Sequence, residues 1–384
     1  SEEADAAPGH IRAYDVRTGK LKWIFHTIPQ PGEAGYETWD DPNAWKHIGG
    51  ANCWAGFSLD EKRGILFAPT GSASFDFYGG MRKGNDLYAN CLLAIDAANG
   101  KLIWHFQFVH HDVWDKDLPT APALVTINRN GKKTDIVAQL TKYGYVYAFE
   151  RATGKPIYTI KEIPVSDKSA LVGAKLSPSQ PIPEGSQPFV RQTFTAADIN
   201  PYLADSSRNE VLNRLKNFRY GNMFLPPGEK TSVVFPGYDG GAEWGGPAVD
   251  PSTGWMYINA NEMGWELTMV PANNEPSAPE TYFTAGQRLY RTNCMGCHGP
   301  DRKGSGNYPS IVNIKSKYTS VQLSKLLETG RRMMPSFKQL SDEDKGAIIS
   351  FVTENKKMGA KIYIKSAEPA DSFLNLPYQR TGYK

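Results

Sequence analysis

The segment AYDVRTGKLKW at residues 13–23 decides the fold, because it returns as AIDAANGKLIW at residues 94–104 and, more weakly, as AFERATGKPIY at residues 148–158. In each copy, apolar residues flank an acidic residue and a Thr-Gly or Asn-Gly pair, which predicts a strand, a tight turn and a second strand. An aromatic residue closes each copy at a fixed distance from the glycine. Such an aromatic can pack on the neighbouring sheet, so the repeat predicts the stacked blades of a β-propeller.

Two further segments, residues 58–67 and 248–257, share a second turn phrase and are predicted to be hairpins of the same design. A β-sandwich with common turns remains the alternative to a propeller. Between residues 167 and 227 the pattern gives way to proline-rich and polar sequence, with one short helix predicted around residues 210–218. Residues 271–280 have the composition of a linker, and helical periodicity follows them.

Composition places the chain among ordinary soluble globular proteins. It has 384 residues, enough for two or three domains, with 40% hydrophobic and 22% charged residues. A net charge of +3 without basic runs argues against nucleic acid as a partner. No apolar run is long enough for a transmembrane segment, and the first residues do not form a signal peptide, so we expect an export signal upstream.

The sequence CMGCH at residues 294–298 predicts covalent attachment of a haem. In a C-x-x-C-H sequence the thiols of Cys294 and Cys297 add to the haem vinyl groups, and His298 becomes an axial ligand of the iron. Helices are predicted at residues 282–291 and 342–354, the second capped by Ser341. A redox dithiol or half of a zinc site is the alternative, but no nearby cysteine supplies the other ligands.

Residues 281–357 resemble a small class I cytochrome c. The sequence MMPSF begins at Met333, and the resemblance makes Met334, directly before a proline, the sixth iron ligand in preference to Met333. Because haem is attached covalently outside the cytoplasm, we expect a periplasmic protein. In that oxidising compartment Cys53 and Cys91 could form a disulfide, which sequence alone leaves open.

Three motifs in the first 270 residues resemble the dehydrogenases that depend on pyrroloquinoline quinone (PQQ). They are the Trp-bearing repeats, HHDVWDKDLP at residues 110–119 and FPGYDGGAEWGG at residues 235–246. The resemblance is greatest to the membrane-type glucose dehydrogenases and the soluble quinohaemoproteins. It implies part of an eight-bladed propeller over residues 1–270 and a small all-α cytochrome c domain over residues 281–357.

The resemblance also implies a set of active-site residues. Asp115 matches the catalytic aspartate, and a carboxylate in a partly dry pocket is suited to take the proton of a substrate hydroxyl. Lys142 matches the cation beside the quinone oxygens, with a solvated strand-end lysine as the alternative. Trp54 matches the tryptophan on which the quinone stacks, with a core tryptophan as the alternative. Trp244 lies either near the PQQ carboxylates or in the packing between blades.

The resemblance also implies a divalent metal, but this chain differs from the family at one of the expected ligand positions. The family holds Ca²⁺ or Mg²⁺ against PQQ with oxygen ligands, and Asp115 is the candidate ligand here. Where the family often has an asparagine ligand, this chain has Ser72, whose hydroxyl is a poorer donor. Asp117 lies where some relatives use an extra carboxylate for a lanthanide.

The visible β sequence amounts to about half of such a propeller, so we expect the chain to be an internal fragment. Residues 358–384 then form a return segment toward further blades. The leading hypothesis is PQQ-dependent oxidation of an aldose hydroxyl, with electrons passed to the haem and then to an external cytochrome, quinone or oxidase. Oxidation of an alcohol or polyol is one alternative. The other is a non-catalytic propeller that serves as a docking module for an electron carrier.

Overall fold

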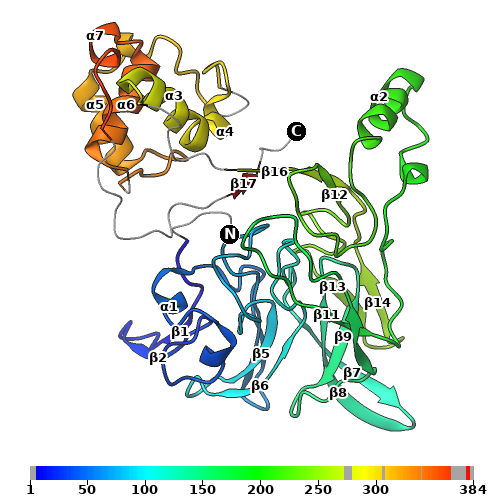
Figure 1. Cartoon of the computed structure of the whole chain (residues 1–384). Helices are drawn as coiled ribbons and strands as arrows, with labels where there is room; N and C mark the ends of the chain where they lie inside the picture. The colour runs from blue at the N-terminus through cyan, green and yellow to red at the C-terminus, as the bar shows by residue number, and fades with distance from the viewer. Residues whose placement is uncertain (1–5, 272–278, 305–307, 339, 365–377, 381–384) are drawn as a thin grey trace. The chain divides into compact units, whose positions relative to one another are not determined.

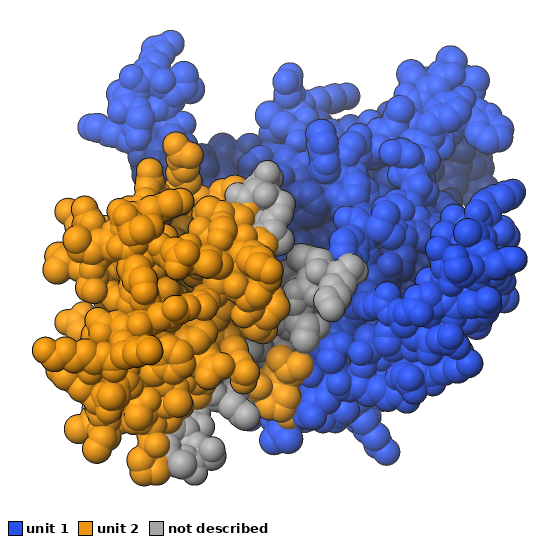
Figure 2. Space-filling view, turned by 90° about the horizontal axis from the view of Figure 1, so that it is seen from above, with its two compact units in different colours: residues 1–269, 383–384 blue, residues 270–382 orange. Residues whose placement is uncertain are grey.

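The computed structural model describes residues 6–271, 279–304, 308–338, 340–364 and 378–380. The described chain divides into two compact units, one that ends at Met269 and one that begins at Val270 (Figure 2). The first unit is built mostly of short antiparallel strands, and the second is mostly helical (Figure 1). The predicted linker lies largely outside the described residues.

The strands of the first unit form several small sheets, of which the largest has the order β3-β4-β5-β6 and the next β7-β8-β9 (Figure 1). The remaining sheets are two-stranded pairs: β1-β2, β10-β11, β12-β15 and β13-β14. The strand bounds are β1 Ile11–Tyr14, β2 Leu21–Phe25, β3 Ser58–Asp60, β4 Ile65–Pro69, β5 Cys91–Asp96, β6 Leu102–Gln107, β7 Ala123–Arg129, β8 Lys132–Leu140, β9 Val146–Glu150, β10 Ile160–Pro164, β11 Ser179–Pro183, β12 Ser232–Val234, β13 Pro247–Asp250, β14 Trp255–Ile258, β15 Trp265–Leu267 and β16 Met269–Pro271.

The repeats form the predicted hairpins, with one exception. The first two copies are the pairs β1-β2 and β5-β6, and the second phrase forms β3-β4 and β13-β14. In the third copy, only an isolated bridge joins Phe149 to Pro156 after the turn. Two hydrogen bonds flank this bridge, from the Glu150 amide to the Lys155 carbonyl at 2.9 Å and from the Ile157 amide to the Ala148 carbonyl at 2.8 Å, so Pro156 lies at a position where no amide hydrogen is needed.

The closing tryptophan of each of the first two repeats packs on the turn of the next repeat. Trp23 Nε1 donates to the Ala97 carbonyl at 3.0 Å, and Trp104 Nε1 donates to the Arg151 carbonyl at 2.9 Å. A Cβ added to Gly154 would lie 2.6 Å from the Trp104 ring, so the indole occupies the space that a side chain would need. The prediction that these aromatics pack on the neighbouring sheet is therefore confirmed.

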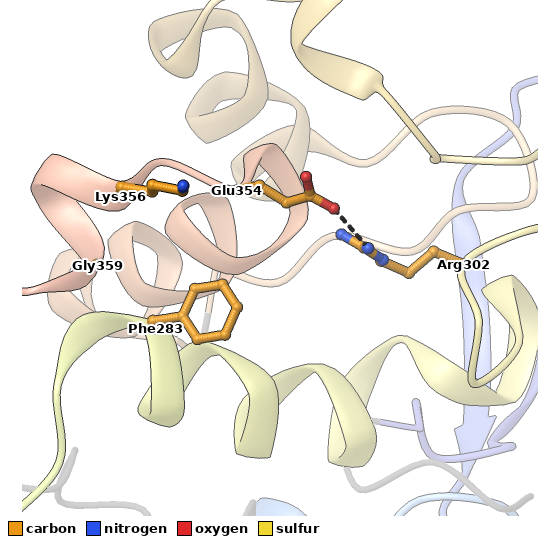
Figure 3. Close-up of a pocket in the computed structure, with 5 residues that line it drawn as sticks. All are labelled: Phe283, Arg302, Glu354, Lys356 and Gly359. Atoms are coloured by element: carbon orange, nitrogen blue, oxygen red, sulfur yellow. Dashed lines mark hydrogen bonds and ion pairs between the residues drawn. The ribbon is translucent and has the colours of Figure 1, made fainter.

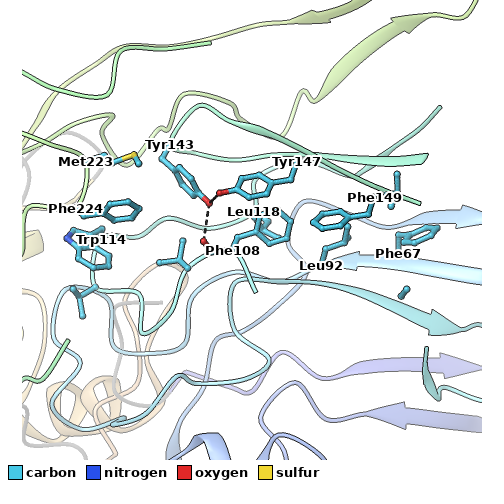
Figure 4. Close-up of a cluster of buried hydrophobic side chains, with 14 of the residues drawn as sticks. Phe67, Leu92, Phe108, Trp114, Leu118, Tyr143, Tyr147, Phe149, Met223 and Phe224 are labelled. Atoms are coloured by element: carbon cyan, nitrogen blue, oxygen red, sulfur yellow. Dashed lines mark hydrogen bonds between the residues drawn. The ribbon is translucent and has the colours of Figure 1, made fainter. Parts of the chain in front are cut away.

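The largest core of the first unit lies under the loops that carry the candidate site. Trp114 and Tyr143 are fully buried in it, and both rings contact Phe224 (Figure 4). The Tyr143 hydroxyl is hydrogen-bonded to the Tyr147 hydroxyl at 2.9 Å. Since Asp115 directly follows Trp114 and Lys142 directly precedes Tyr143, two buried aromatics fix the backbone at both positions.

Helices of the first unit are few: α1 Ala44–His47 and α2 Asp205–Leu215. The prediction of a helix at residues 210–218 was wrong in its bounds, because the helix begins five residues earlier and ends before Lys216. Its first turn, DSSRN, is wholly polar. It therefore gives no apolar periodicity from which sequence analysis could place the start.

The second unit contains helices α3 Tyr282–Asn293, α4 Met295–His298, α5 Ser320–Thr329, α6 Asp342–Thr353 and α7 Lys356–Gly359. Both predicted helices are present, and Ser341 caps α6 by accepting a hydrogen bond from the Asp344 amide at 3.0 Å. Helices α3 and α6 pack so closely that a Cβ on Gly286 would lie 2.0 Å from the Ala347 carbonyl oxygen.

Beyond α7, the described part of the predicted return segment includes β17, Tyr378–Arg380, which pairs with β16. Most of that segment lies outside the described residues. Among the residues that the structure describes, no helix is both long enough and apolar enough to cross a membrane.

Candidate active site

The carboxylate of Asp112 stabilises the loop that carries Asp115 by accepting hydrogen bonds from backbone amides of that loop. The two Asp112 oxygens accept the backbone amides of Trp114 at 2.8 Å and Lys116 at 2.7 Å. Asn90 Nδ2 donates to the same carboxylate at 2.9 Å, and Ser72 Oγ also donates to it. Asp112 is buried, so these hydrogen bonds replace the water that its charge has lost.

Below this loop, Arg82 anchors the main chain of Asp112. Arg82 is buried, forms an ion pair with Asp86 at 2.7 Å and donates to the carbonyls of Phe75 and Asp112. Lys116 is also buried and donates from Nζ to the Pro236 carbonyl at 2.7 Å. The loop is therefore tied to two distant segments of the first unit.

Two carboxylates share one ammonium group at the centre of the site. Lys142 Nζ lies 3.2 Å from Asp115 Oδ1 and 3.7 Å from Asp117 Oδ2. Burial raises the pKa of Asp115 well above its usual value. The negative charge of Asp117 raises this pKa further, whereas the charge of Lys142 acts in the opposite direction. The pKa of Asp117 is lowered, because Lys142 and hydrogen bonds from Ser72 outweigh the effect of burial. Asp115, with its raised pKa, is therefore suited to proton exchange, whereas the lowered pKa of Asp117 favours its ionised form.

Trp54 stands beside this group. Its side chain is 40% exposed, so it is not a core tryptophan, and its Nε1 donates to Asp117 Oδ2 at 3.0 Å. Lys142 Nζ lies 5.6 Å from the centroid of the indole ring. An accessible aromatic plane therefore lies next to a cation and two carboxylates.

The loop around Trp244 contacts the same lysine through its backbone. The amide of Gly241 donates to the Lys142 carbonyl, and the Lys142 charge acts on Glu243, although burial leaves the Glu243 pKa raised. Trp244 itself is 76% exposed, so it does not pack between strands in this structure. Its contact with a cofactor stays a prediction.

The second unit contains a cavity of about 570 Å³ that brings together all the predicted haem residues. Cys294, Cys297, His298 and Met334 line it, together with apolar side chains of α5 and α6. His298 Nδ1 donates to the Pro309 carbonyl at 2.9 Å, which leaves Nε2 as the nitrogen available to iron. Met333 is 67% exposed, whereas Met334 packs partly buried against the core.

A second, open pocket of about 440 Å³ lies elsewhere in this unit and is lined by Phe283, Arg302, Glu354, Lys356 and Gly359 (Figure 3). The Arg302 guanidinium forms an ion pair with Glu354 at 2.8 Å and lies over the Phe351 ring. Its one carboxylate is therefore already paired, and none of the residues predicted to form a site lies in this pocket.

The possible disulfide is not formed. Cys53 and Cys91 are free thiols in the same apolar cluster, and burial raises the pKa of both. A thiol with a raised pKa is a poor nucleophile, so the two side chains serve as core residues.

Comparison with known proteins identifies both units. Residues 1–296 match the family model described as glucose/ethanol/alcohol dehydrogenase, beta-propeller domain. Residues 282–352 match the model described as cytochrome C oxidase, cbb3-type, subunit III. The chain belongs to the PQQ-dependent β-propeller dehydrogenases. It combines such a propeller domain with a small helical cytochrome c domain, as the sequence predicted, and the alternative of a β-sandwich was wrong.

Curated relatives of this quinoprotein include dehydrogenases of different substrates. The chain is 33% identical over 297 residues to quinoprotein glucose dehydrogenase A of Acinetobacter calcoaceticus, covering 72% of this chain and 34% of that protein. It is 34% identical over 276 residues to the quinate/shikimate dehydrogenase (quinone) of Acinetobacter baylyi, covering 71% and 33%. The chain therefore spans about a third of the length of these relatives.

Among solved structures, the quinohemoprotein alcohol dehydrogenase of Comamonas testosteroni has a similar fold. The TM-score is 0.54 at 18% identity, and the match covers 91% of this chain and 72% of that one. The likeness extends beyond the propeller unit, and at this identity it concerns the fold alone.

The residues of this quinoprotein fit its organic cofactors better than they fit a divalent metal. An accessible indole face beside a lysine suits a flat, anionic quinone, and the cavity around His298 suits a haem. By contrast, the described residues contain no group of three or more His, Cys, Asp or Glu arranged to hold a metal ion. Ser72, the doubtful ligand, directs its hydroxyl at Asp112 instead.

The residues that sequence analysis missed are those that support the site. Asp112 lies within the quoted motif at residues 110–119, so its presence near Asp115 could have been inferred, although its role could not. Asn90 and Arg82 contact the loop only through tertiary structure and carry no sequence signal. The predicted set of Trp54, Asp115 and Lys142 is brought together.

Proposed function

We propose that the protein containing this chain oxidises a hydroxyl group of an aldose at PQQ, and that the electrons pass to haem c and then to an external acceptor. The observation that carries this proposal is the group of Asp115, Lys142 and Trp54, in which a carboxylate of raised pKa, a cation and an accessible aromatic plane meet. A docking module would have no use for such a group, and the relatives named above are dehydrogenases.

Each residue of the group has a distinct task. When bound, PQQ supplies an electrophilic carbon that accepts hydride from the substrate. Asp115 accepts the hydroxyl proton at a carboxylate oxygen, and its raised pKa brings it closer to the pKa of an effective base. Lys142, 3.2 Å away, stabilises negative charge beside it, and Trp54 offers the surface for stacking.

In the cytochrome domain, Cys294 and Cys297 would hold the porphyrin, and His298 and Met334 would bind its iron. Haem with these two ligands supplies a one-electron carrier of raised potential. Because such haem is attached outside the cytoplasm, we propose a periplasmic location for this part of the protein. A cytochrome, a quinone or an oxidase would serve as the external acceptor.

A cyclic polyhydroxy acid is the second candidate substrate. The chain is as similar to a quinate/shikimate dehydrogenase, at 34% identity, as it is to a glucose dehydrogenase, at 33%. A primary alcohol or polyol is the remaining alternative.

Replacing Asp115 by Asn tests the proposed base directly. The amide cannot accept the proton, so we expect dye reduction by the PQQ-loaded full gene product to fall about 10²–10⁴-fold, since that is the usual contribution of a general base. The haem spectrum should be unchanged, because Asp115 lies in the other unit. Activity within about twofold of the wild type would refute the role of Asp115.

A further inference from the structure

The Asp117 carboxylate is surrounded by donors from three segments of the chain. Its Oδ2 accepts the Trp54 indole N–H at 3.0 Å and lies 3.7 Å from Lys142 Nζ, and its Oδ1 accepts the backbone amide of Ser72 at 2.5 Å. Both carboxylate oxygens are therefore already engaged by donors of the protein, from three separate segments of the chain.

The glycine beside Asp117 keeps this arrangement possible. A Cβ added to Gly71 would lie 2.7 Å from Asp117 Oδ1, closer than real Cβ contacts come. Any other residue at position 71 would displace the carboxylate from the Ser72 amide. Because Gly71 has no side chain, the Asp117 carboxylate can approach the backbone at this position closely.

This contact fixes the orientation of the accessible tryptophan. An indole has a single N–H donor, and in Trp54 that donor is held by Asp117. A side chain that is 40% exposed has little packing to hold it, so this charge-assisted hydrogen bond is the restraint that sets the plane of the ring. The same carboxylate attracts Lys142, which places the cation next to that plane.

We propose that Asp117 is a positioning residue that fixes Trp54 and Lys142 for the quinone, and that it is not a metal ligand. The inference rests on the proposed function. Calcium takes six to eight oxygen ligands, whereas here Asp117 and Asp115 share an ammonium group and Ser72 turns its hydroxyl to Asp112. A metal at Asp117 would have to compete with the Ser72 amide, the Trp54 indole N–H and the Lys142 ammonium group for this carboxylate.

A double-mutant cycle on PQQ binding tests the inference. PQQ is titrated into the apo form of the full gene product, and quenching of intrinsic fluorescence gives the Kd without any turnover. We expect Asp117→Asn and Trp54→Phe each to raise the Kd about tenfold, since each removes one charge-assisted hydrogen bond. The double variant should lose clearly less than the roughly hundredfold that additive effects would give, because the two changes share the contact between Asp117 and the indole N–H.

The matched control is a second tryptophan–aspartate pair in the same unit. Trp265 Nε1 donates to Asp239 Oδ2 at 2.7 Å. The effect of Asp239→Asn should be additive with that of Trp54→Phe, because Asp239 accepts the N–H of a different indole, that of Trp265. Circular dichroism and the haem spectrum verify that each variant is folded. If Asp117→Asn does not fold, Trp54→Phe alone decides, because it keeps the carboxylate and an aromatic ring for stacking, although a smaller one, and lacks the N–H donor that Asp117 accepts.

Several outcomes would overturn the inference. Additive losses of Asp117→Asn and Trp54→Phe would show that the contact does not act on the quinone, and an unchanged Kd in Trp54→Phe would do the same. A tenfold rise in the Ca²⁺ concentration needed for PQQ binding by Asp117→Asn would identify a metal ligand, whereas we expect a change within about twofold. Failure of the wild type to bind PQQ would overturn the proposed function as well.

Discussion

Asp115 and Asp117 compete for one ammonium group, and this competition gives them different chemistry. Asp117 receives additional hydrogen bonds from Ser72 and Trp54, whereas Asp115 lies partly buried beside the resulting negative charge. The protein thus keeps one carboxylate charged and raises the pKa of the other. Residue type alone could not assign these roles, because both positions are aspartate.

The raised pKa of Asp115 predicts the acid limb of the pH profile. A base must be deprotonated, so kcat/KM should fall as the pH decreases through the pKa of Asp115 in the free enzyme. Because burial raises that pKa, the inflection should lie above about 3.9, the ordinary value of aspartate. Removing the neighbouring charge with Asp117→Asn should move the inflection to lower pH. Steady-state rates across pH measure both values, and an inflection that rises in Asp117→Asn would contradict this assignment.

The adjacent residues Met333 and Met334 allow a matched test of the iron ligand. We expect Met334→Ala to lose the methionine–iron charge-transfer band and to lower the haem reduction potential, because a thioether favours ferrous iron. Met333→Ala should keep both properties, since that side chain is mostly exposed. Visible spectroscopy and a redox titration separate the two variants. The reverse pattern would make Met333 the ligand.

The hairpin repeat is the element that the sequence predicts best, because strand, turn and closing aromatic are all local. The residues on which each tryptophan packs lie in the next hairpin, so a single repeat does not reveal them. The pairing nevertheless follows one rule, because Trp23 packs on the turn glycine of the second copy, Gly100, and Trp104 packs on that of the third, Gly154.

Substitutions at two turn glycines test how much this packing contributes. Gly154 and Gly64 both have positive φ, but only Gly154 lies against a tryptophan, and nothing lies within 4 Å of a Cβ at Gly64. Gly64→Ala should lower the free energy of unfolding by roughly 1–2 kcal/mol, the cost of a left-handed alanine. Gly154→Ala should lower it by roughly 2–4 kcal/mol, because overpacking is added. Urea denaturation compares them, and equal losses would show that the indole contact is weak.

Elements whose role depends on distant contacts were beyond sequence analysis. Asp112 and Asn90 are 22 positions apart and meet only in the folded loop. Trp244 has the residue type of a packing or stacking side chain, and only its exposure shows that it does not pack. The doubtful metal ligand Ser72 was recognised from its position, but the partner of its hydroxyl required the structure.

At the scale of the whole molecule, a dehydrogenase propeller and a cytochrome occur in one chain. In the proposed function, the propeller unit contributes the base, the cation and the aromatic plane, and the helical unit contributes the thiols and the iron ligands. The proposed function requires that electrons taken from the substrate at the propeller unit reach the iron of the helical unit.

Rapid mixing of the PQQ-loaded full gene product with glucose, quinate or an alcohol tests this claim most directly, by following the visible bands of the haem. The account predicts that at least one substrate converts the haem to its ferrous spectrum, and that Asp115→Asn slows this conversion about 10²–10⁴-fold. If the haem stays ferric with every substrate, although PQQ is bound and a chemical reductant reduces the iron, the account is contradicted.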